Sequence, residues 1–161
     1  MSRVARWIAC AALASAGLSG QARGQAPMEQ RAAGTFEVEL TVEQDEDEGS
    51  TRLGRMRLDK RYTGGLQATA VGSMLTAMSP VEGSAAYTAI ERVYGMLEGR
   101  SGSFVLVHLG TLERGAGELD IRIVADSGTG ELEGIRGRML IEVDGGLHRY
   151  VLDFSFPDIA E

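Results

Sequence analysis

Four ionisable side chains fall where the local pattern places apolar residues: Lys60, Glu91, His108 and His148. Each lies in a segment in which apolar and polar residues alternate, and each is on the apolar side. Burying a charge away from water is unfavourable unless the group is paired or neutralised. These four residues therefore either form a satisfied structural network or mark a functional site.

The residue types indicate what chemistry such a site would perform. A glutamate beside a histidine can move protons, so Glu91 and His108 are candidate catalytic residues. Lys60 or a protonated histidine such as His148 could hold a carboxylate or an enolate-like oxygen. Tyrosine hydroxyls could donate further hydrogen bonds to a ligand oxygen, which adds Tyr62, Tyr87, Tyr94 and Tyr150 as candidate ligand-binding residues. The structural alternative pairs Glu91 with an arginine or a tyrosine and each histidine with the backbone.

Other catalytic chemistries find little support in the sequence. Glu91, His108 and His148 would make a two-histidine, one-carboxylate set, but no local ligand motif accompanies them, so we predict no metal and no cofactor. No Gly-x-Ser-x-Gly motif occurs, and the single cysteine, Cys10, lies in the N-terminal apolar segment. The acidic run 43–48 does not match an EF-hand loop, and we predict a solvated loop there.

Strands must position these residues, because the alternation has a period of two along most of the chain. Glycine pairs and Asp-Gly sequences separate the segments and predict hairpin turns at 64–65, 98–102 and 144–146. We predict eight strands, at about 36–42, 53–62, 66–74, 87–97, 104–109, 119–123, 135–143 and 148–156.

Eight hairpin-linked strands with one apolar face can remove their free edges by closing on themselves. We therefore predict an all-β fold, a single antiparallel eight-stranded barrel over residues 34–157, after a lead-in at 27–33 and before a tail at 158–161. Such a barrel is either filled by side chains or holds one small ligand. Segments 87–97 and 104–109 are partly apolar on both faces, which makes a homo-oligomer possible.

Residues 1–26 are typical of a secretory signal peptide, with arginines ahead of an alanine-rich apolar core. This predicts a secreted or periplasmic protein. The core is shorter than the roughly 20 residues that span a bilayer, so we expect no stable membrane insertion. Cleavage removes three arginines and no acid, leaving 13 basic and 23 acidic residues. A net charge of −10 disfavours binding to nucleic acid.

A set of short motifs, taken in order, resembles bacterial proteins grouped as domain of unknown function 3224. They are Gly34-Thr-Phe-Glu-Val38, Leu58-Asp59-Lys60, Gly83-Ser-Ala-Ala-Tyr87, Glu91-Arg-Val, Gly99-Arg-Ser-Gly-Ser-Phe104, His108-Leu-Gly-Thr111, Asp126-Ser-Gly-Thr-Gly-Glu-Leu132 and His148-Arg-Tyr150. The resemblance covers about residues 34–156. It implies a calycin-like barrel similar to plant allene oxide cyclase and the dirigent proteins, which use a cavity for apolar, oxygenated small molecules and often form oligomers. The chain departs from the family pattern at Ser73 and has no counterpart of the cyclase's catalytic cysteine.

Three functions follow from these observations. We expect an exported barrel that binds a small, largely apolar molecule, with Lys60, Glu91, His108 and His148 as its polar groups. The alternatives are an isomerase or cyclase-type enzyme that uses Glu91 and His108 for proton transfer, and a structural or interaction barrel with a filled core.

Overall fold

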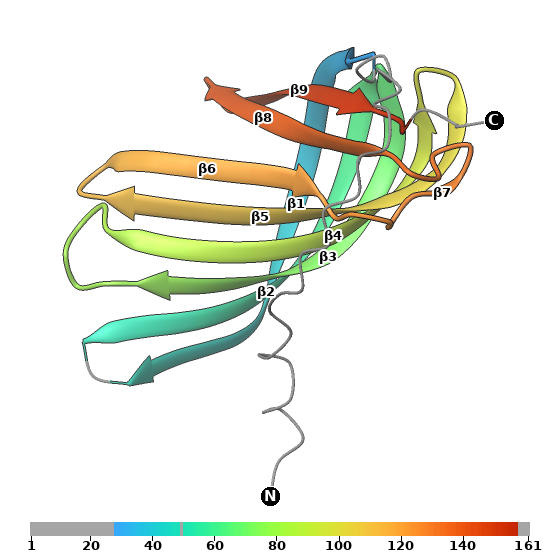
Figure 1. Ribbon diagram of the computed structural model, residues 1–161. Helices are drawn as coiled ribbons and strands as arrows, with labels where there is room; N and C mark the ends of the chain where they lie inside the picture. Colours follow the sequence, from blue (N-terminus) through green and yellow to red (C-terminus); the bar gives the residue numbers. More distant parts are fainter. Residues whose placement is uncertain (1–27, 49, 158–161) are drawn as a thin grey trace, which may run out of the picture.

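A computed structural model describes residues 28–48 and 50–157 (Figure 1). Every regular element in these ranges is a β-strand. The strands are β1 (Gln30–Glu48), β2 (Thr51–Gly64), β3 (Leu66–Met78), β4 (Ala85–Leu97), β5 (Arg100–Glu113), β6 (Ala116–Ile123), β7 (Thr129–Gly130), β8 (Arg136–Asp144) and β9 (Leu147–Ser155).

Eight of these strands close into one antiparallel barrel. Around the ring the order is β1, β2, β3, β4, β5, β6, β8, β9 and back to β1, and the β4–β5 pairing completes the circuit. The two-residue strand β7 adds a short pairing to β5. The predicted all-β, eight-stranded antiparallel barrel is confirmed, with β7 as an extra strand.

Strand β1 is longer at both ends than the sequence pattern predicted. Residues 30–33, predicted as a lead-in, pair with β9, beginning with Gln30 opposite Phe154. The acidic run predicted as a loop continues the strand as far as Glu48, opposite Thr51, after a β-bulge near Val42. The loop prediction was wrong because pairing with β2 satisfies the backbone, while the side chains of residues 43–46 stay exposed and need no burial.

The core fills the end of the barrel where the chain passes from β2 to β3 and from β4 to β5. Inward positions there carry large buried side chains, among them Tyr62, Phe104, Tyr150 and Phe154. The Tyr150 hydroxyl accepts a hydrogen bond from the Leu66 amide at 2.8 Å, and it lies 3.1 Å from the Thr63 carbonyl oxygen, to which it donates. This end is therefore closed by packed aromatic rings.

The opposite end of the barrel is where hairpins β1–β2, β3–β4, β5–β6 and β8–β9 lie (Figure 1). Strands β6 and β8 diverge toward it and pair at a single position, Arg122 opposite Arg138. Asp120 links this junction, because its two carboxylate oxygens accept hydrogen bonds from Arg122 at 2.7 Å and from Arg138 at 2.8 Å. The barrel is thus weakly closed on the β6–β8 side.

The predicted signal segment and the C-terminal tail lie outside the described residues. Within residues 28–48 and 50–157, no helix is long and apolar enough to cross a membrane.

Candidate functional site

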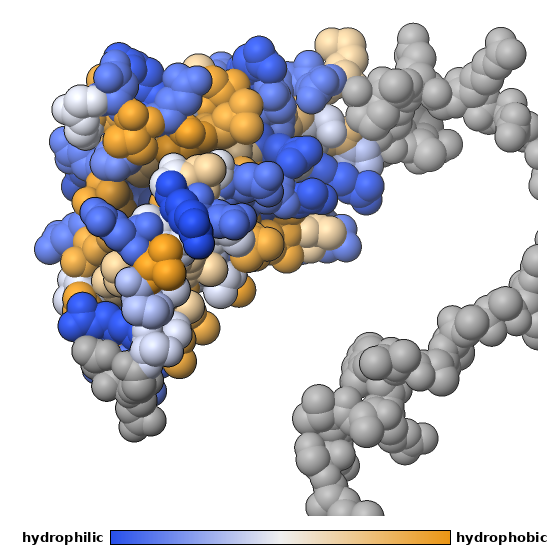
Figure 2. Space-filling view, turned by 90° about the vertical axis from the view of Figure 1, so that its left-hand side faces the viewer, coloured by the Kyte–Doolittle hydropathy of each residue, from blue (hydrophilic) through white to orange (hydrophobic). Residues whose placement is uncertain are grey.

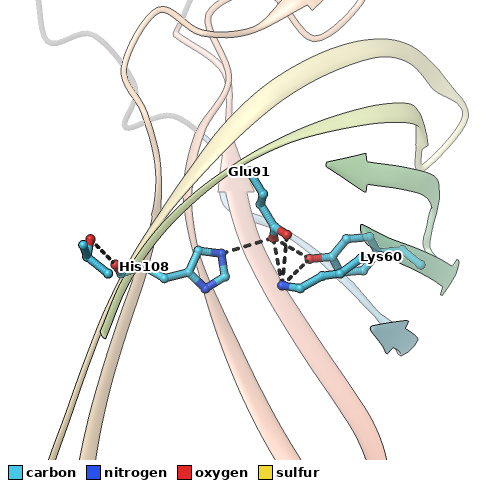
Figure 3. A network of polar contacts seen from close by, with 5 residues as sticks. Lys60, Glu91 and His108 are labelled. Carbon is cyan, nitrogen blue, oxygen red and sulfur yellow. Dashed lines mark hydrogen bonds and ion pairs between the residues drawn. The ribbon is translucent and has the colours of Figure 1, made fainter. Parts of the chain in front are cut away.

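Four of the predicted site residues meet inside the barrel, around the carboxylate of Glu91 (Figure 3). Its Oε1 atom accepts a hydrogen bond from the Tyr62 hydroxyl at 2.7 Å and one from Lys60 Nζ at 3.1 Å. His108 Nε2 lies 3.1 Å from the same oxygen. Residues from β2, β4 and β5, up to 48 positions apart in the chain, therefore form one polar group, called here the Glu91 network.

Strand register explains why these side chains converge. Glu91 lies opposite Gly72 on β3 and Leu106 on β5, and these paired residues form one row of inward-facing side chains across the strands. Lys60 and His108 each belong to an adjacent row of this kind. Gly72 leaves the space beside Glu91 open, since a Cβ atom there would come within 2.2 Å of the Ile90 carbonyl oxygen and 2.9 Å of the Glu91 Cβ. The missing side chain lets strands β3 and β4 pack closely at the point where the carboxylate turns inward.

The network is almost fully removed from water. The side chain of Glu91 is 0% exposed, that of His108 is 4% exposed and that of Lys60 is 7% exposed. Burial by itself favours the neutral acid, but the hydrogen bond from His108, the positive charge of Lys60 and the hydrogen bond from Tyr62 outweigh it. The pKa of Glu91 is therefore lowered, and the residue is a carboxylate at neutral pH.

Tyr62 is held in the opposite state. Burial, followed by the charge of Glu91 and the hydrogen bond to it, raises the pKa of the Tyr62 hydroxyl well above its usual value. The hydroxyl remains protonated and donates to Glu91. Because Glu91 is ionised, its contact with His108 is best satisfied by a proton on Nε2 that is donated to the carboxylate.

One oxygen of the Glu91 carboxylate accepts no hydrogen bond. Glu91 Oε2 lies 3.0 Å from Lys60 Nζ, which is an ion-pair distance, but no hydrogen bond of good geometry reaches it and it is buried. A buried charged oxygen without a directed donor is unfavourable. The network therefore retains the capacity to accept one more hydrogen bond.

An aromatic group extends from the network toward β9. Lys60 Nζ lies 5.0 Å from the centroid of the Phe36 ring, and the Phe36 centroid lies 5.3 Å from that of Tyr62 and 4.9 Å from that of His148. The Tyr150 ring packs edge-on against Tyr62 at 5.4 Å. His148 and Tyr150 thus adjoin the network through ring contacts, while the Tyr150 hydroxyl is occupied by the backbone.

The last two tyrosines differ in position. Tyr87 shares the inward face of β4 with Glu91, and burial together with the charge of Glu91 raises its pKa. Tyr94 lies on the outer face of β4 and is 46% exposed, so the structure does not bring it to the network. In the described part of the chain, no three His, Cys, Asp or Glu side chains converge in a way that could hold a metal ion.

A set of apolar side chains lines the inward face near the four hairpins and is called here the mouth. Leu40, Val42 and Val143 face inward by register, yet they are 48%, 59% and 63% exposed. The remaining members are Leu119, Met56 and Met74. Figure 2, which views the molecule from this end, shows hydrophobic patches (orange) between hydrophilic residues (blue).

By strand register, the mouth adjoins the Glu91 network. His108 lies in the same row of inward-facing residues as Met56, Met74 and Val42. The next row toward the hairpin end of the barrel contains Leu119 opposite Gly110. His108 is therefore the network residue nearest the mouth. Sequence reasoning predicted the polar residues but not the mouth, because alternation gives the direction of a side chain and not its exposure.

Comparisons with known proteins agree with this architecture. The family model described as "Protein of unknown function (DUF3224)" matches residues 32–154. The chain belongs to the DUF3224 family. A DUF3224 protein with unknown function from Shewanella oneidensis MR-1, known from a crystal structure, is similar at 45% identity and a TM-score of 0.77, covering 81% of this chain and 98% of that one. No curated protein matches.

Proposed function

We propose that this DUF3224 barrel binds a small, largely apolar molecule bearing a polar oxygen, with its apolar part on the mouth and its polar part directed at the Glu91 network. The observation that carries the proposal is the exposure of the inward-facing side chains Leu40, Val42 and Val143 beside a buried charged group. A filled structural barrel has no need for apolar side chains that face inward and remain in contact with water.

The energetic gain from covering the mouth is large enough for useful affinity. A ligand that removes about 200 Å² of apolar surface from water gains about 5 kcal/mol before the entropy of association is subtracted. Lys60 and His108 lie at the inner limit of this surface and supply hydrogen-bond donors or acceptors for an oxygen. The resemblance in sequence motifs implies a barrel similar to plant allene oxide cyclase and the dirigent proteins, which hold oxygenated apolar molecules, and this favours the same class of ligand.

The test uses 1-anilinonaphthalene-8-sulfonate as a probe, because it combines an apolar ring system with an anionic group. Val143→Asp places a charge in the mouth and should weaken probe binding at least about fivefold, the equivalent of about 1 kcal/mol. Leu140→Asp is the matched control, since Leu140 is 60% exposed on the outer face of the same strand. Equal effects of the two substitutions would refute the mouth as the binding surface.

A second experiment looks for the natural ligand. Native mass spectrometry of the protein purified from its own host should show a co-purifying small molecule that Val143→Asp loses and Leu140→Asp retains. The N-terminal segment supports export, so the same purification should find the chain, shortened by its first 22 or 26 residues, outside the cytoplasm.

A proton-transferring enzyme is the second candidate, favoured by the contact between Glu91 and His108. The lowered pKa of Glu91 makes it a weak base, so His108 would accept the proton and Glu91 would position the imidazole. Epoxides and enones are the substrates to test. His108→Gln should abolish any turnover while its circular dichroism spectrum stays that of the folded barrel, and a fully active His108→Gln protein would exclude this role.

A further inference from the structure

Tyr94, the predicted ligand-binding residue that lies away from the Glu91 network, borders a groove on the outside of the barrel. The groove lies across β2, β3 and β4 beside the β2–β3 turn, and its volume is about 580 Å³. Small-molecule sites typically measure about 300–1,000 Å³. The outward side chains that line the groove, called here the outer groove, are Arg61, Thr63, Gln67, Thr69 and Tyr94.

Every one of these side chains carries a hydrogen-bonding group. Strand register sets three of them in one row, because Arg61 lies opposite Thr69 and Thr69 lies opposite Tyr94. Thr63 and Gln67 follow one outward position nearer the β2–β3 turn. The outer groove therefore combines a guanidinium group, an amide, two aliphatic hydroxyls and a phenol.

Most of these groups have no side-chain partner within the protein. The Thr63 hydroxyl lies 2.9 Å from that of Thr35, to which it is hydrogen-bonded. Among residues 28–48 and 50–157, the side chains of Arg61, Gln67, Thr69 and Tyr94 make no such hydrogen bond and no ion pair. These four groups remain available to a ligand.

Tyr94 adds a flat ring surface to the polar groups. Its side chain is exposed to water, whereas Tyr62 and Ala68, which also border the outer groove, are 2% and 7% exposed and offer little apolar area. A sugar ring has a C–H face that is weakly positive and can stack on the negative face of an aromatic ring. Its hydroxyls both donate and accept, so they can bond to a guanidinium, an amide and a hydroxyl at once.

The surrounding charges favour a neutral ligand. Arg61 is the one charged residue among those lining the outer groove in the described part of the chain, and Glu37 lies directly opposite it on β1. An adjoining groove of about 470 Å³ shares Arg61 and Thr69 and also contains Glu37, Glu39 and Asp59. Carboxylates accept hydrogen bonds from neutral hydroxyls but repel anions.

Gly95 fixes the position of the outer groove's walls. A Cβ atom at Gly95 would come within 2.2 Å of the Gln67 carbonyl oxygen and 2.6 Å of the Ala68 Cα, so β3 and β4 approach closely beside Tyr94. The sheet therefore holds Gln67 and Tyr94 in place. A site that is already ordered loses less entropy when a ligand binds.

We propose that the outer groove binds a neutral saccharide, with one sugar ring stacked on Tyr94 and its hydroxyls bonded to Arg61, Gln67 and Thr69. These side chains point away from the barrel interior, whereas the mouth and the Glu91 network face into it. The saccharide site is therefore independent of the small-molecule site proposed above, and the two can be tested separately.

Saturation-transfer difference NMR of the full chain, with cellotriose, maltotriose and chitotriose as probes, tests this proposal. At least one trisaccharide should receive saturation on its ring C–H protons and bind with a Kd below about 1 mM. Tyr94→Ala should weaken this binding at least about tenfold, while Tyr94→Phe, which keeps the ring, should retain most of the affinity. Ile90→Ala, at an exposed outward position two steps along the same strand, is the matched control and should bind as the unaltered chain does.

The proposal fails if none of the three trisaccharides binds, or if Tyr94→Ala binds them as tightly as the unaltered chain does. Inorganic phosphate at millimolar concentration should not displace the trisaccharide; displacement that Arg61→Met abolishes would show an anion site instead. Val143→Asp, which alters the mouth, should leave trisaccharide binding unchanged, and a loss of binding in that variant would contradict a separate site.

Discussion

Replacing Glu91 by glutamine is the sharpest test of the network, because it removes one charge and almost no volume. The carboxylate holds Lys60 Nζ at 3.0 Å, the Tyr62 hydroxyl at 2.7 Å and His108 Nε2 at 3.1 Å. Glutamine retains an oxygen that can accept from Tyr62. It leaves the Lys60 ammonium buried without its counter-ion, and it turns an amide donor toward a group that is already a donor.

The expected loss in the free energy of unfolding follows from these contacts. Removing one member of a buried ion pair destabilises a protein by about 3–5 kcal/mol. The hydrogen bond that glutamine keeps offsets about 1 kcal/mol of this. We therefore expect Glu91→Gln to lower the free energy of unfolding by about 3 kcal/mol, a large part of the 5–15 kcal/mol typical of a domain. With a urea m-value of about 1.5 kcal/mol/M, the midpoint should fall by about 2 M.

The pH dependence of this loss has a defined sign. The pKa of Glu91 is lowered by folding, so its contribution is complete above the pKa of an unfolded glutamate, about 4.3. It disappears as the pH falls through the lower folded pKa. The difference in stability between the unaltered protein and Glu91→Gln should therefore be greatest near neutral pH and shrink below about pH 4.

Urea unfolding followed by fluorescence and circular dichroism, repeated from pH 7 to pH 3, measures both effects. Lys60→Met is the partner variant, and the double variant Lys60→Met/Glu91→Gln should be less destabilised than the sum of the singles by about 2 kcal/mol. A loss below about 1 kcal/mol for Glu91→Gln, or a loss constant over this pH range, would refute a buried, ionised Glu91 paired with Lys60.

Three further predictions address the frame around the network. Tyr150→Phe removes the acceptor of the buried Leu66 amide and should cost about 1–3 kcal/mol of stability in urea unfolding, while no measurable loss would contradict that hydrogen bond. Gly72→Ala forces a Cβ to within 2.2 Å of a β4 carbonyl oxygen and should lower the free energy of unfolding by about 1–3 kcal/mol, whereas a stabilised variant would show that β3 and β4 can separate. Asp120→Asn weakens the link to Arg138 and should speed hydrogen exchange in β6 and β8 but not in β2 and β3; uniform or unchanged exchange would contradict the weak β6–β8 junction.

The period-two alternation was sufficient to predict the barrel and the direction of most side chains. The alternation over residues 53–62 puts Leu58, Lys60 and Tyr62 on one face of a strand, and the structure has them facing the interior. The alternation did not predict where the strands end. The acidic residues after Val42 continue β1 because β2 offers them backbone partners, and that pairing is a tertiary fact with no trace in the local pattern.

The sequence by itself determined that Lys60, Glu91 and His108 lie on apolar faces, because each side chain's face follows from its parity along the strand. Only the tertiary structure decided that they touch, since contact depends on the register between strands and on Gly72 leaving room beside Glu91. The same holds for Val143 and Ile90, which are apolar residues in strands like any others. Parity places Val143 on the inward face and Ile90 on the outward face, but that both remain exposed to water follows from how the ring of strands closes and where it splays.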